Sequence, residues 1–373
     1  MKKRHALISL LLSLFLQDIS SQSLRSTLKK SNSDIIQSVL KNNGKYEVQI
    51  LLTEVLANKK RNRFKKKHFN VNSKNYFYPA STVKLPIALL VIEKINENPR
   101  IDLNTKLLIE GDSIYTNLRN EISTLIAVSS NESYNRLFEF LGQDYINHKL
   151  KEKGFKNFRI FHRLSTSNSD VLETKELSFF KNDSIIFIQK GLKNKPLKRL
   201  RINKLSKGIG YIENEKLVSK PMNFSKKNYF SIKDLNKLIS IIFFPKKHKT
   251  KKFNLTPQQL EFITTQMSST PKELGYDNKK YPDNYVKFFL FGDKKLSTDN
   301  LTMYNKVGNA YGYSIDNAYI YDKKSKKHFI LTACIYTNSN NILNDDIYEY
   351  ESIGIPFLAE IAREFIYKKD ILK

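Results

Sequence analysis

Residues 78–84 read Tyr-Pro-Ala-Ser-Thr-Val-Lys, and an apolar run follows them as far as Ile95. The run predicts a long helix from about Ser81 to Ile95. Ser81 and Lys84 stand three residues apart, so their side chains share one helical face, with about 5–6 Å between the Cβ atoms. A serine hydroxyl attacks well only after a neighbouring base takes its proton. The stretch therefore predicts a nucleophile and its activating base at the start of a helix.

The start of a helix suits this chemistry. A lysine that apolar neighbours shield near the positive end of a helix is stabilised as the neutral amine. The free backbone N–H groups at the same end can stabilise an oxyanion. Ser-x-x-Lys alone is a weak motif, because it arises by chance in many chains of this length. Taken alone, an exposed helix cap with an unrelated lysine is the simpler interpretation.

Two more elements follow in order along the chain. Residues 129–131 read Ser-Ser-Asn at the junction of two predicted helices, and residues 306–308 read Lys-Val-Gly before a predicted hairpin. Asn135 follows on the second of those helices. With Tyr-Pro before Ser81, these elements resemble the class A β-lactamases of the penicillin-recognising β-lactamase/transpeptidase-like superfamily, whose motifs are Ser-x-x-Lys, Ser-Asp-Asn and Lys-Thr-Gly. The resemblance covers roughly residues 35–370.

The resemblance implies a role for each motif residue. Ser81 would be acylated, Lys84 would activate it, and Ser129 would pass a proton toward the leaving nitrogen. Asn131 would hydrogen-bond the substrate amide, and Lys306 would lie near Ser129 and attract the substrate carboxylate. The family's chemistry implies no cofactor and no metal.

The resemblance also assigns the strand after Lys306 to substrate binding. Gly308 would let the strand edge approach the ligand, and the backbone N–H groups of Ser81 and Asn309 would form the oxyanion hole. Val307 stands where the family has a hydroxyl and cannot donate a hydrogen bond to a substrate carboxylate, a loss of about 1.5–3 kcal/mol. Two interpretations stay open: Lys306 alone compensates, or the preferred substrate lacks that carboxylate.

The deacylating residue is the largest departure from the family. Class A β-lactamases hydrolyse their acyl-enzyme with a glutamate in an E-x-x-L-N loop, and that motif is absent here. Alignment on the Arg-Leu pair at 163–164 places Asn168 at the position of the glutamate, and an amide cannot accept a proton from water at neutral pH. Asp170, Glu173 and Glu176 are the alternatives. The sequence thus predicts acylation without predicting rapid deacylation.

Other residues near the motifs carry weaker predictions. Ser130 replaces the aspartate of the family motif, and we expect a small effect because that residue mainly supports local structure. His162 and Tyr311 are candidates to lie near the site, although core packing and strand propensity explain them equally well. Cys334 lies in an apolar run and is expected to be a buried core thiol.

The order of elements predicts an α+β fold (an α/β sandwich). Helices and strands near both chain ends enclose a mostly helical middle, which favours an antiparallel sheet built from both ends, flanked by the terminal helices. The helical subdomain is expected at roughly 81–270, with a basic, irregular insertion at 180–228. The predicted outer elements are a helix at 34–40, strands at 46–55 and 68–77 with a basic loop at 58–68 between them, a hairpin at 318–321 and 329–336, and a helix at 353–367. The predicted inner elements are helices at 132–141, 143–153, 232–243 and 256–267, part of a helix at 125–128, and a strand at 285–291.

Residues 1–21 are typical of a secretory signal peptide. Lys2, Lys3 and Arg4 precede the apolar run 6–16, and small residues follow it. The run is too short to span a membrane, which takes about 20 apolar residues, and no cysteine follows that could carry a lipid. We therefore predict an exported protein, periplasmic or secreted, with no stable membrane anchor and one catalytic domain at 22–373.

The composition excludes several classes of protein. The single cysteine excludes a disulfide framework, and the six histidines show no metal-ligand spacing. Lys and Arg number 64 against 36 acidic residues, for a net charge of +28. A lysine-rich solvated surface explains this charge, while an anionic polymer or lipid is the alternative. Nucleic acid ranks last because no aromatic–basic recognition motif is present. The oligomeric state stays open.

Three functional interpretations follow. The first is an exported serine acyl-hydrolase that forms an acyl-enzyme at Ser81 with β-lactams or related amides. The second is a peptidoglycan D,D-peptidase or an esterase on the same fold. The third is a non-catalytic homologue that binds an anionic envelope polymer.

Overall fold

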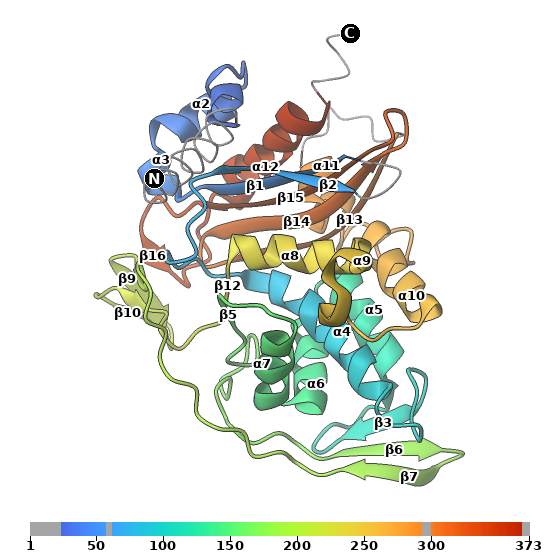
Figure 1. Ribbon diagram of the computed structural model, residues 1–373. Coiled ribbons are helices and arrows are strands. Elements are labelled where there is room, and N and C mark those ends of the chain that lie inside the picture. Colours follow the sequence, from blue (N-terminus) through green and yellow to red (C-terminus); the bar gives the residue numbers. More distant parts are fainter. Residues whose placement is uncertain (1–23, 57–61, 293–299, 368–373) are drawn as a thin grey trace, which may run out of the picture.

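A five-stranded antiparallel sheet joins the two ends of the chain (Figure 1). The computed structural model describes residues 24–56, 62–292 and 300–367. The strand order is β13-β14-β15-β1-β2, so the first two strands of the chain pair with the last long hairpin. The strands are β1 Gln49–Leu56, β2 Arg63–Phe69, β13 Leu301–Ala310, β14 Tyr313–Asp322 and β15 Lys327–Tyr336. This confirms the predicted α+β fold with a sheet from both chain ends.

Helices from the chain ends cover one face of the sheet. These are α2 Asp34–Lys41, α11 Phe288–Phe291 and α12 Ile355–Ala362, the last flanked by π-helical turns at Tyr350–Gly354 and Arg363–Tyr367. Ile36, Phe289 and Phe357 from these helices pack with Leu52 and Leu331 of the sheet in one apolar cluster. The apolar segments at both ends of the chain therefore form a single layer, which packs on the face of the sheet that is uppermost in Figure 1.

The mostly helical middle of the chain packs on the opposite face. Helix α8 lies against β1, β14 and β15, and the other helices follow below it (Figure 1). The Ser231 hydroxyl accepts a hydrogen bond from Asp234 N and caps α8, which has the predicted bounds. The helices of this layer are α4 Lys84–Ile95, α5 Leu118–Ala127, α6 Asn131–Leu141, α7 Gln143–Glu152, α8 Ile232–Phe243, α9 Pro245–His248 and α10 Pro257–Ser268.

The expectation of an irregular segment at 180–228 is wrong in part. A four-stranded sheet, ordered β4-β3-β6-β7, forms at the far end of the molecule, and short strand pairs follow it. Its hairpin pairs Phe179 with Phe187 and buries Phe179 against the helical layer. The second strand carries the unbroken apolar run Ile185–Ile188, so the sequence shows no alternation of apolar and polar residues there. The strands are β3 Lys106–Ile109, β4 Thr116–Asn117, β5 Phe158–Arg159, β6 Leu177–Lys181, β7 Ser184–Gln189, β8 Ser206–Lys207, β9 Gly210–Glu213, β10 Lys216–Val218, β11 Met222–Asn223, β12 Tyr229–Phe230 and β16 Ile342–Leu343.

Two local predictions are wrong. The basic segment predicted as a loop forms most of β2, an edge strand whose Lys67 pairs with Glu54 at 2.7 Å. Lysines suit an exposed edge because they discourage pairing with another chain, so the second strand lies at 63–69 and not at 68–77. The predicted strand at 285–291 is instead the short helix α11, because Phe288 and Phe289 pack into the apolar cluster on the α12 face.

The predicted signal peptide at 1–21 lies outside the described residues. Within the described residues, no helix combines the length and the hydropathy needed to cross a membrane.

Candidate active site

Ser81 stands on a tight turn at the edge of the helical layer. Residues Ala80–Val83 form a 3-10 turn, η1, and α4 begins only at Lys84. Ala80 takes a left-handed conformation with φ 46°, and Thr82 folds back so that its hydroxyl donates to Pro79 O at 2.5 Å. The predicted helix is confirmed, except that its first turn is tighter than an α-helix. Ser81 therefore sits on a turn that exposes it to a pocket.

Lys84 is fully buried behind Ser81. Its side chain is 0% exposed, and its Nζ donates to Ser129 O and, at 2.7 Å, to Asn131 Oδ1. Ser129 Oγ lies 3.3 Å from the same Nζ. Burial lowers the pKa of Lys84 well below its usual value, and the positive charge of Lys306 acts in the same direction. A neutral amine has two N–H donors and one lone pair, so the two acceptors take its donors and the lone pair stays available to a hydroxyl.

Ser129 connects the two lysines. It occupies the junction between α5 and α6 in a left-handed conformation with φ 58°. Lys306 Nζ donates to Ser129 Oγ at 2.8 Å, which leaves the Ser129 proton free to be donated onward. Ser130 caps α6 by accepting from Ser133 N at 3.1 Å. The serine thus supports the helix start, the local role expected of the aspartate that it replaces.

Lys306 projects from β13, the edge strand of the main sheet, and is 2% exposed. Burial lowers the pKa of Lys306 to about 7; the nearby Asp316 opposes this shift and Lys287 adds to it. Asn305 links the latter two residues, since Lys287 donates to Asn305 Oδ1 at 2.9 Å and Asn305 donates to Asp316 Oδ1 at 2.8 Å. A hydrogen-bonded layer therefore lies behind the site and holds the lysine-bearing strand. Sequence reasoning missed this layer because its members lie on different elements that only the folded chain brings together.

Gly308 lies against the backbone of the Ser81 turn. A Cβ added at this glycine would stand 2.5 Å from Ser81 N and 2.8 Å from Ala80 Cβ. The strand therefore packs directly against the Ser81 turn, while the approach of a ligand to Gly308 stays a prediction. Neighbouring Asn309 lines the pocket, whereas Val307 is buried in the apolar cluster on the other side of the sheet. The Val307 side chain is therefore not brought to the pocket.

Replacing Gly308 with alanine should lower the rate of acylation by about 10²-fold. The added methyl group must push β13 away from Ser81, and a displacement near 1 Å at a reacting centre can cost that factor. Gly44→Ala is the matched control, because nothing lies within 4 Å of a Cβ there. Time courses of covalent labelling measure both variants. Equal rates for Gly308→Ala and the wild-type protein would contradict the role of this close approach.

The loop at 162–175 forms a second wall of the pocket and is held by buried polar contacts. Arg163 pairs with Glu139 of α6 through contacts of 2.5 and 2.9 Å and donates to the carbonyl groups of Val171 and Glu173. Asn135 exchanges two hydrogen bonds with the backbone of Leu164. The loop conformation therefore depends on one helix, α6, which also begins at Asn131 of the site.

We expect Glu139→Ala to lower the free energy of unfolding by about 3–5 kcal/mol, because it leaves the buried charge of Arg163 unpaired. Glu132→Ala on the same helix is the control, since Glu132 is exposed and its loss should cost little. Urea unfolding measures both variants. A Glu139→Ala protein as stable as the Glu132→Ala protein would show that the ion pair does not hold the loop.

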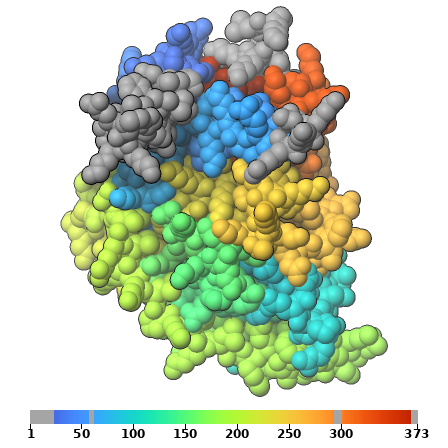
Figure 2. Space-filling view, viewed as in Figure 1, coloured from blue at the N-terminus to red at the C-terminus, as the bar shows by residue number. Residues whose placement is uncertain are grey.

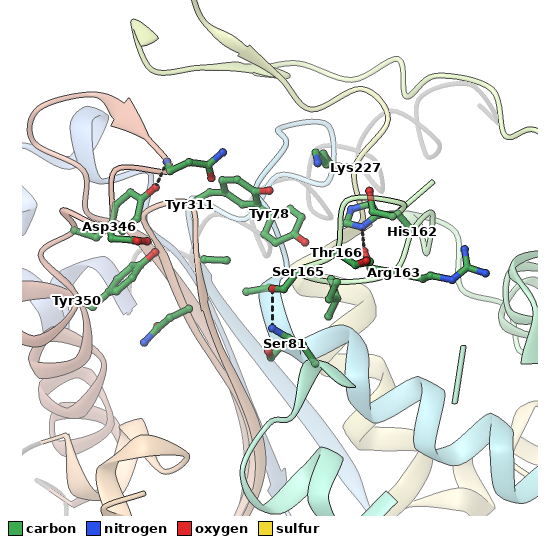
Figure 3. A pocket seen from close by; sticks show the side chains of 18 residues that line it. Tyr78, Ser81, His162, Arg163, Ser165, Thr166, Lys227, Tyr311, Asp346 and Tyr350 are labelled. Atoms are coloured by element: carbon green, nitrogen blue, oxygen red, sulfur yellow. Dashed lines mark hydrogen bonds between the residues drawn. The ribbon is translucent and has the colours of Figure 1, made fainter. Parts of the chain in front are cut away.

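None of the residues proposed for deacylation lines the pocket. Asn168, Asp170 and Glu173 are all exposed, and Glu176 pairs with Lys190 at 2.7 Å. The loop instead presents hydroxyl groups, and one of them, Ser165 Oγ, accepts from Asn131 Nδ2 at 2.8 Å (Figure 3). The hydroxyl-bearing residues of the loop that line the pocket are Ser165, Thr166 and Ser169. Among the described residues, Asp346 is the only carboxylate in the pocket wall.

The pocket encloses about 520 Å³ and has a wide aromatic wall. Figure 3 shows Ser81 at its base, with Asp346 and Tyr350 on one side and Lys227 and His162 on the other. Tyr78 meets Tyr311 edge to face across 4.8 Å. Tyr311 was a candidate from the sequence, but Asp346, Tyr350 and Lys227 were not, because they lie far from every motif. Figure 2 shows the molecule in the same orientation as Figure 1, with its lower half built by the middle of the chain. That part of the chain supplies Asn131, Lys227 and the loop at 162–175 to the pocket.

The described residues contain no group of three or more His, Cys, Asp or Glu side chains placed to hold a metal ion. Cys334 is buried in the core, as expected. Burial raises the pKa of its thiol above the usual value.

Several solved structures share this fold. A β-lactamase from Sphaerobacter thermophilus DSM 20745 aligns with a TM-score of 0.50 and 12% identity over 88% of this chain and 95% of that chain. A mutant of PBP-A, in an acyl-enzyme complex with penicillin G, aligns with a TM-score of 0.55 and 12% identity over 94% of this chain and 97% of that chain. A β-lactamase from Burkholderia ambifaria aligns with a TM-score of 0.52 and 9% identity over 88% of this chain and 97% of that chain. No curated protein sequence matches the chain.

The fold is that of β-lactamases and of PBP-A. A model of the Beta-lactamase enzyme family matches residues 31–368, nearly the whole chain, and the chain belongs to that family.

Proposed function

We propose that the protein is a serine acyl-transfer enzyme that opens β-lactams, or related amides, by forming an acyl-enzyme at Ser81. The observation that carries the proposal is the connected set behind Ser81: Lys84 Nζ lies 3.3 Å from Ser129 Oγ, and Lys306 Nζ lies 2.8 Å from the same oxygen. Two amines and a hydroxyl joined in this way can move a proton between nucleophile and leaving group. Asn131, Gly308 and Asn309 complete the substrate-binding part of the site.

In the proposed reaction, the neutral amine of Lys84 takes the Ser81 proton as Ser81 Oγ bonds to the carbonyl carbon. The backbone N–H groups of Ser81 and Asn309 stabilise the oxyanion. The C–N bond then breaks, and the leaving nitrogen receives the Ser129 proton, which Lys84 replaces. Burial, helped by the Lys306 ammonium, keeps the pKa of Lys84 low, and the same ammonium attracts the substrate carboxylate. No atoms are lost, because the opened ring stays attached to Ser81.

We propose that deacylation is slow. Hydrolysis of the ester needs a base that activates water, and a carboxylate near Ser81 is the usual group. Asp346 stands in the opposite wall from the loop at 162–175, and that loop contributes hydroxyl groups instead. Asp170 and Glu173 stay candidates only if the loop rearranges when substrate binds.

A peptidoglycan D,D-peptidase or an esterase is the second candidate. Val307 points into the apolar cluster and offers no hydroxyl for the carboxylate of a β-lactam, which favours an esterase whose substrates lack that carboxylate. Export by the predicted signal peptide at 1–21 would bring the enzyme to the cell envelope, and N-terminal sequencing of the secreted protein tests it.

A fluorescent penicillin separates these functions. We expect a covalent label that forms and persists through washing. A label that clears within minutes would indicate an efficient β-lactamase. If no label forms and neither esters nor D-alanyl peptides are cleaved, the enzymatic proposal is wrong, and binding of an anionic polymer becomes the better interpretation.

Acylation by a penicillin should fall as the pH rises through about 7. Lys306 carries its positive charge below its pKa of about 7 and loses it above, so the attraction for the substrate carboxylate is present on the acid side. The second-order rate constant of acylation reports the free enzyme, in which this pKa applies. A neutral ester substrate should lack this basic limb. A penicillin rate constant that stays level from about pH 6 to about pH 9, a range that spans this pKa, would contradict the role given to Lys306.

A further inference from the structure

One wall of the active-site pocket presents a buried imidazole beside a lysine. His162 is 5% exposed, and its ring stacks on Tyr78 at 6.4 Å between centroids. Lys227 comes from the turn between β11 and β12, and its Nζ lies 6.0 Å from the centroid of the Tyr311 ring. Both residues line the pocket that contains Ser81 (Figure 3).

The His162 ring has one satisfied nitrogen and one free nitrogen. Nδ1 contacts Arg163 O, and a carbonyl oxygen can only accept, so Nδ1 carries the hydrogen. Nε2 is buried and has no hydrogen-bond partner among the described residues. Burial, with the nearby charge of Lys227, lowers the pKa of the imidazole to about 4. At neutral pH the ring therefore presents an unpaired acceptor, which is costly to bury without a donor.

A buried asparagine holds the two residues together. Asn228 is fully buried, and its Oδ1 accepts from Phe161 N at 2.6 Å and from His162 N at 3.3 Å. Tyr76 donates to Asn228 O at 2.9 Å from the other side. Because Asn228 directly follows Lys227, these bonds fix the position of the lysine relative to the imidazole.

The two groups together specify a ligand that offers both a donor and an acceptor. A carboxamide or peptide group fits, because its N–H can be donated to His162 Nε2 while its C=O accepts from Lys227. A carboxylate has no hydrogen to donate and would set its lone pairs against Nε2. The negative charge of Asp346 across the pocket also disfavours a carboxylate. An apolar group would leave both protein groups unpaired.

We propose that His162 and Lys227 form a subsite for a second amide in the acyl part of the substrate, so that peptide-like acyl donors are preferred over simple apolar ones. This inference rests on the proposed acylation of Ser81 and adds the class of acyl group. It gives the segment at 180–228 a function, since that segment carries Lys227 into the pocket.

The test uses penicillins that differ only at the end of the acyl chain. Succinamoyl and glutaramoyl derivatives of 6-aminopenicillanic acid carry the second amide at two chain lengths. Each amide is compared with two analogues of the same length. One ends in a carboxylate, and the other is an apolar isostere that ends in a methyl-branched carbon. The second-order rate constant of acylation is measured for each by intact-protein mass spectrometry. In the wild-type protein, at least one amide should react about tenfold or more faster than its apolar isostere, the factor expected for one or two hydrogen bonds.

The variants Lys227→Met and His162→Phe should bring this ratio of rate constants close to one. Lys226→Met is the matched control, because Lys226 is exposed and does not line the pocket, and it should keep the ratio. The inference is overturned if neither amide outpaces its isostere, if a carboxylate is the fastest, or if Lys227→Met keeps the preference. If none of the penicillins reacts with the wild-type protein, the proposed function itself is wrong.

Discussion

Ser81→Ala should abolish covalent labelling by a fluorescent penicillin. Alanine removes the proposed attacking oxygen. The other hydroxyl groups of the pocket wall, Ser165, Thr166 and Ser169, lie on the loop at 162–175, whereas the Lys84 amine is hydrogen-bonded to Ser129 and Asn131. We expect no label within the time in which the wild-type protein is fully labelled. Non-covalent binding should persist, because Asn131, Lys306 and the strand edge are unchanged.

The controls for Ser81→Ala are a fold measurement and a second serine. The thermal midpoint should change little, because the Ser81 side chain is only partly buried. Ser165→Ala should still be labelled, though more slowly, because Ser165 accepts a hydrogen bond from Asn131. Full labelling of a folded Ser81→Ala protein would mean that another group is the nucleophile.

Lys84→Met should slow acylation by about 10²–10⁴-fold, the usual contribution of a positioned acid or base. Methionine keeps the length of the side chain but cannot take the Ser81 proton. It also leaves Ser129 O and Asn131 Oδ1 without their donor, so some stability is lost, at about 1–3 kcal/mol for each unsatisfied group. Labelling kinetics should therefore be measured at a temperature where unfolding curves show the variant to be folded.

Lys65→Met is the matched control for Lys84→Met, since Lys65 is an exposed residue of the edge strand β2. It should be labelled at the wild-type rate. If Lys84→Met were also labelled at that rate while folded, the base would have to be another group, and Lys306 through Ser129 would be the next candidate.

The three motifs could be found from the sequence because each depends on local geometry. Ser81 and Lys84 are one helical turn apart, and residues 129–131 and 306–308 each act through a short stretch of backbone. The order of the motifs, and the helix or strand on which each stands, led to the predicted resemblance to β-lactamases. The family match and the shared fold confirm that resemblance. The helices with clear capping signals, such as α8 with Ser231, could be predicted for the same reason.

The rest of the site could not be predicted because it is made by contacts between distant segments. Lys227 reaches the pocket through bonds between Asn228 and the backbone at 161–162. Asp346 and Tyr350 follow a short strand that pairs with β9 of the middle segment. Such long-range pairings produce no periodic pattern in the local sequence. The alignment that put Asn168 in place of the glutamate also depended on sequence spacing alone, and the loop fold leaves that residue exposed.

The most direct test of the central claim is intact-protein mass spectrometry after incubation with benzylpenicillin, followed by peptide mapping. We predict that the protein gains the mass of one whole penicillin molecule, that the gain persists for many minutes, and that it maps to the peptide containing Ser81. No gain in mass, or an adduct on a peptide without Ser81, would contradict the proposed mechanism.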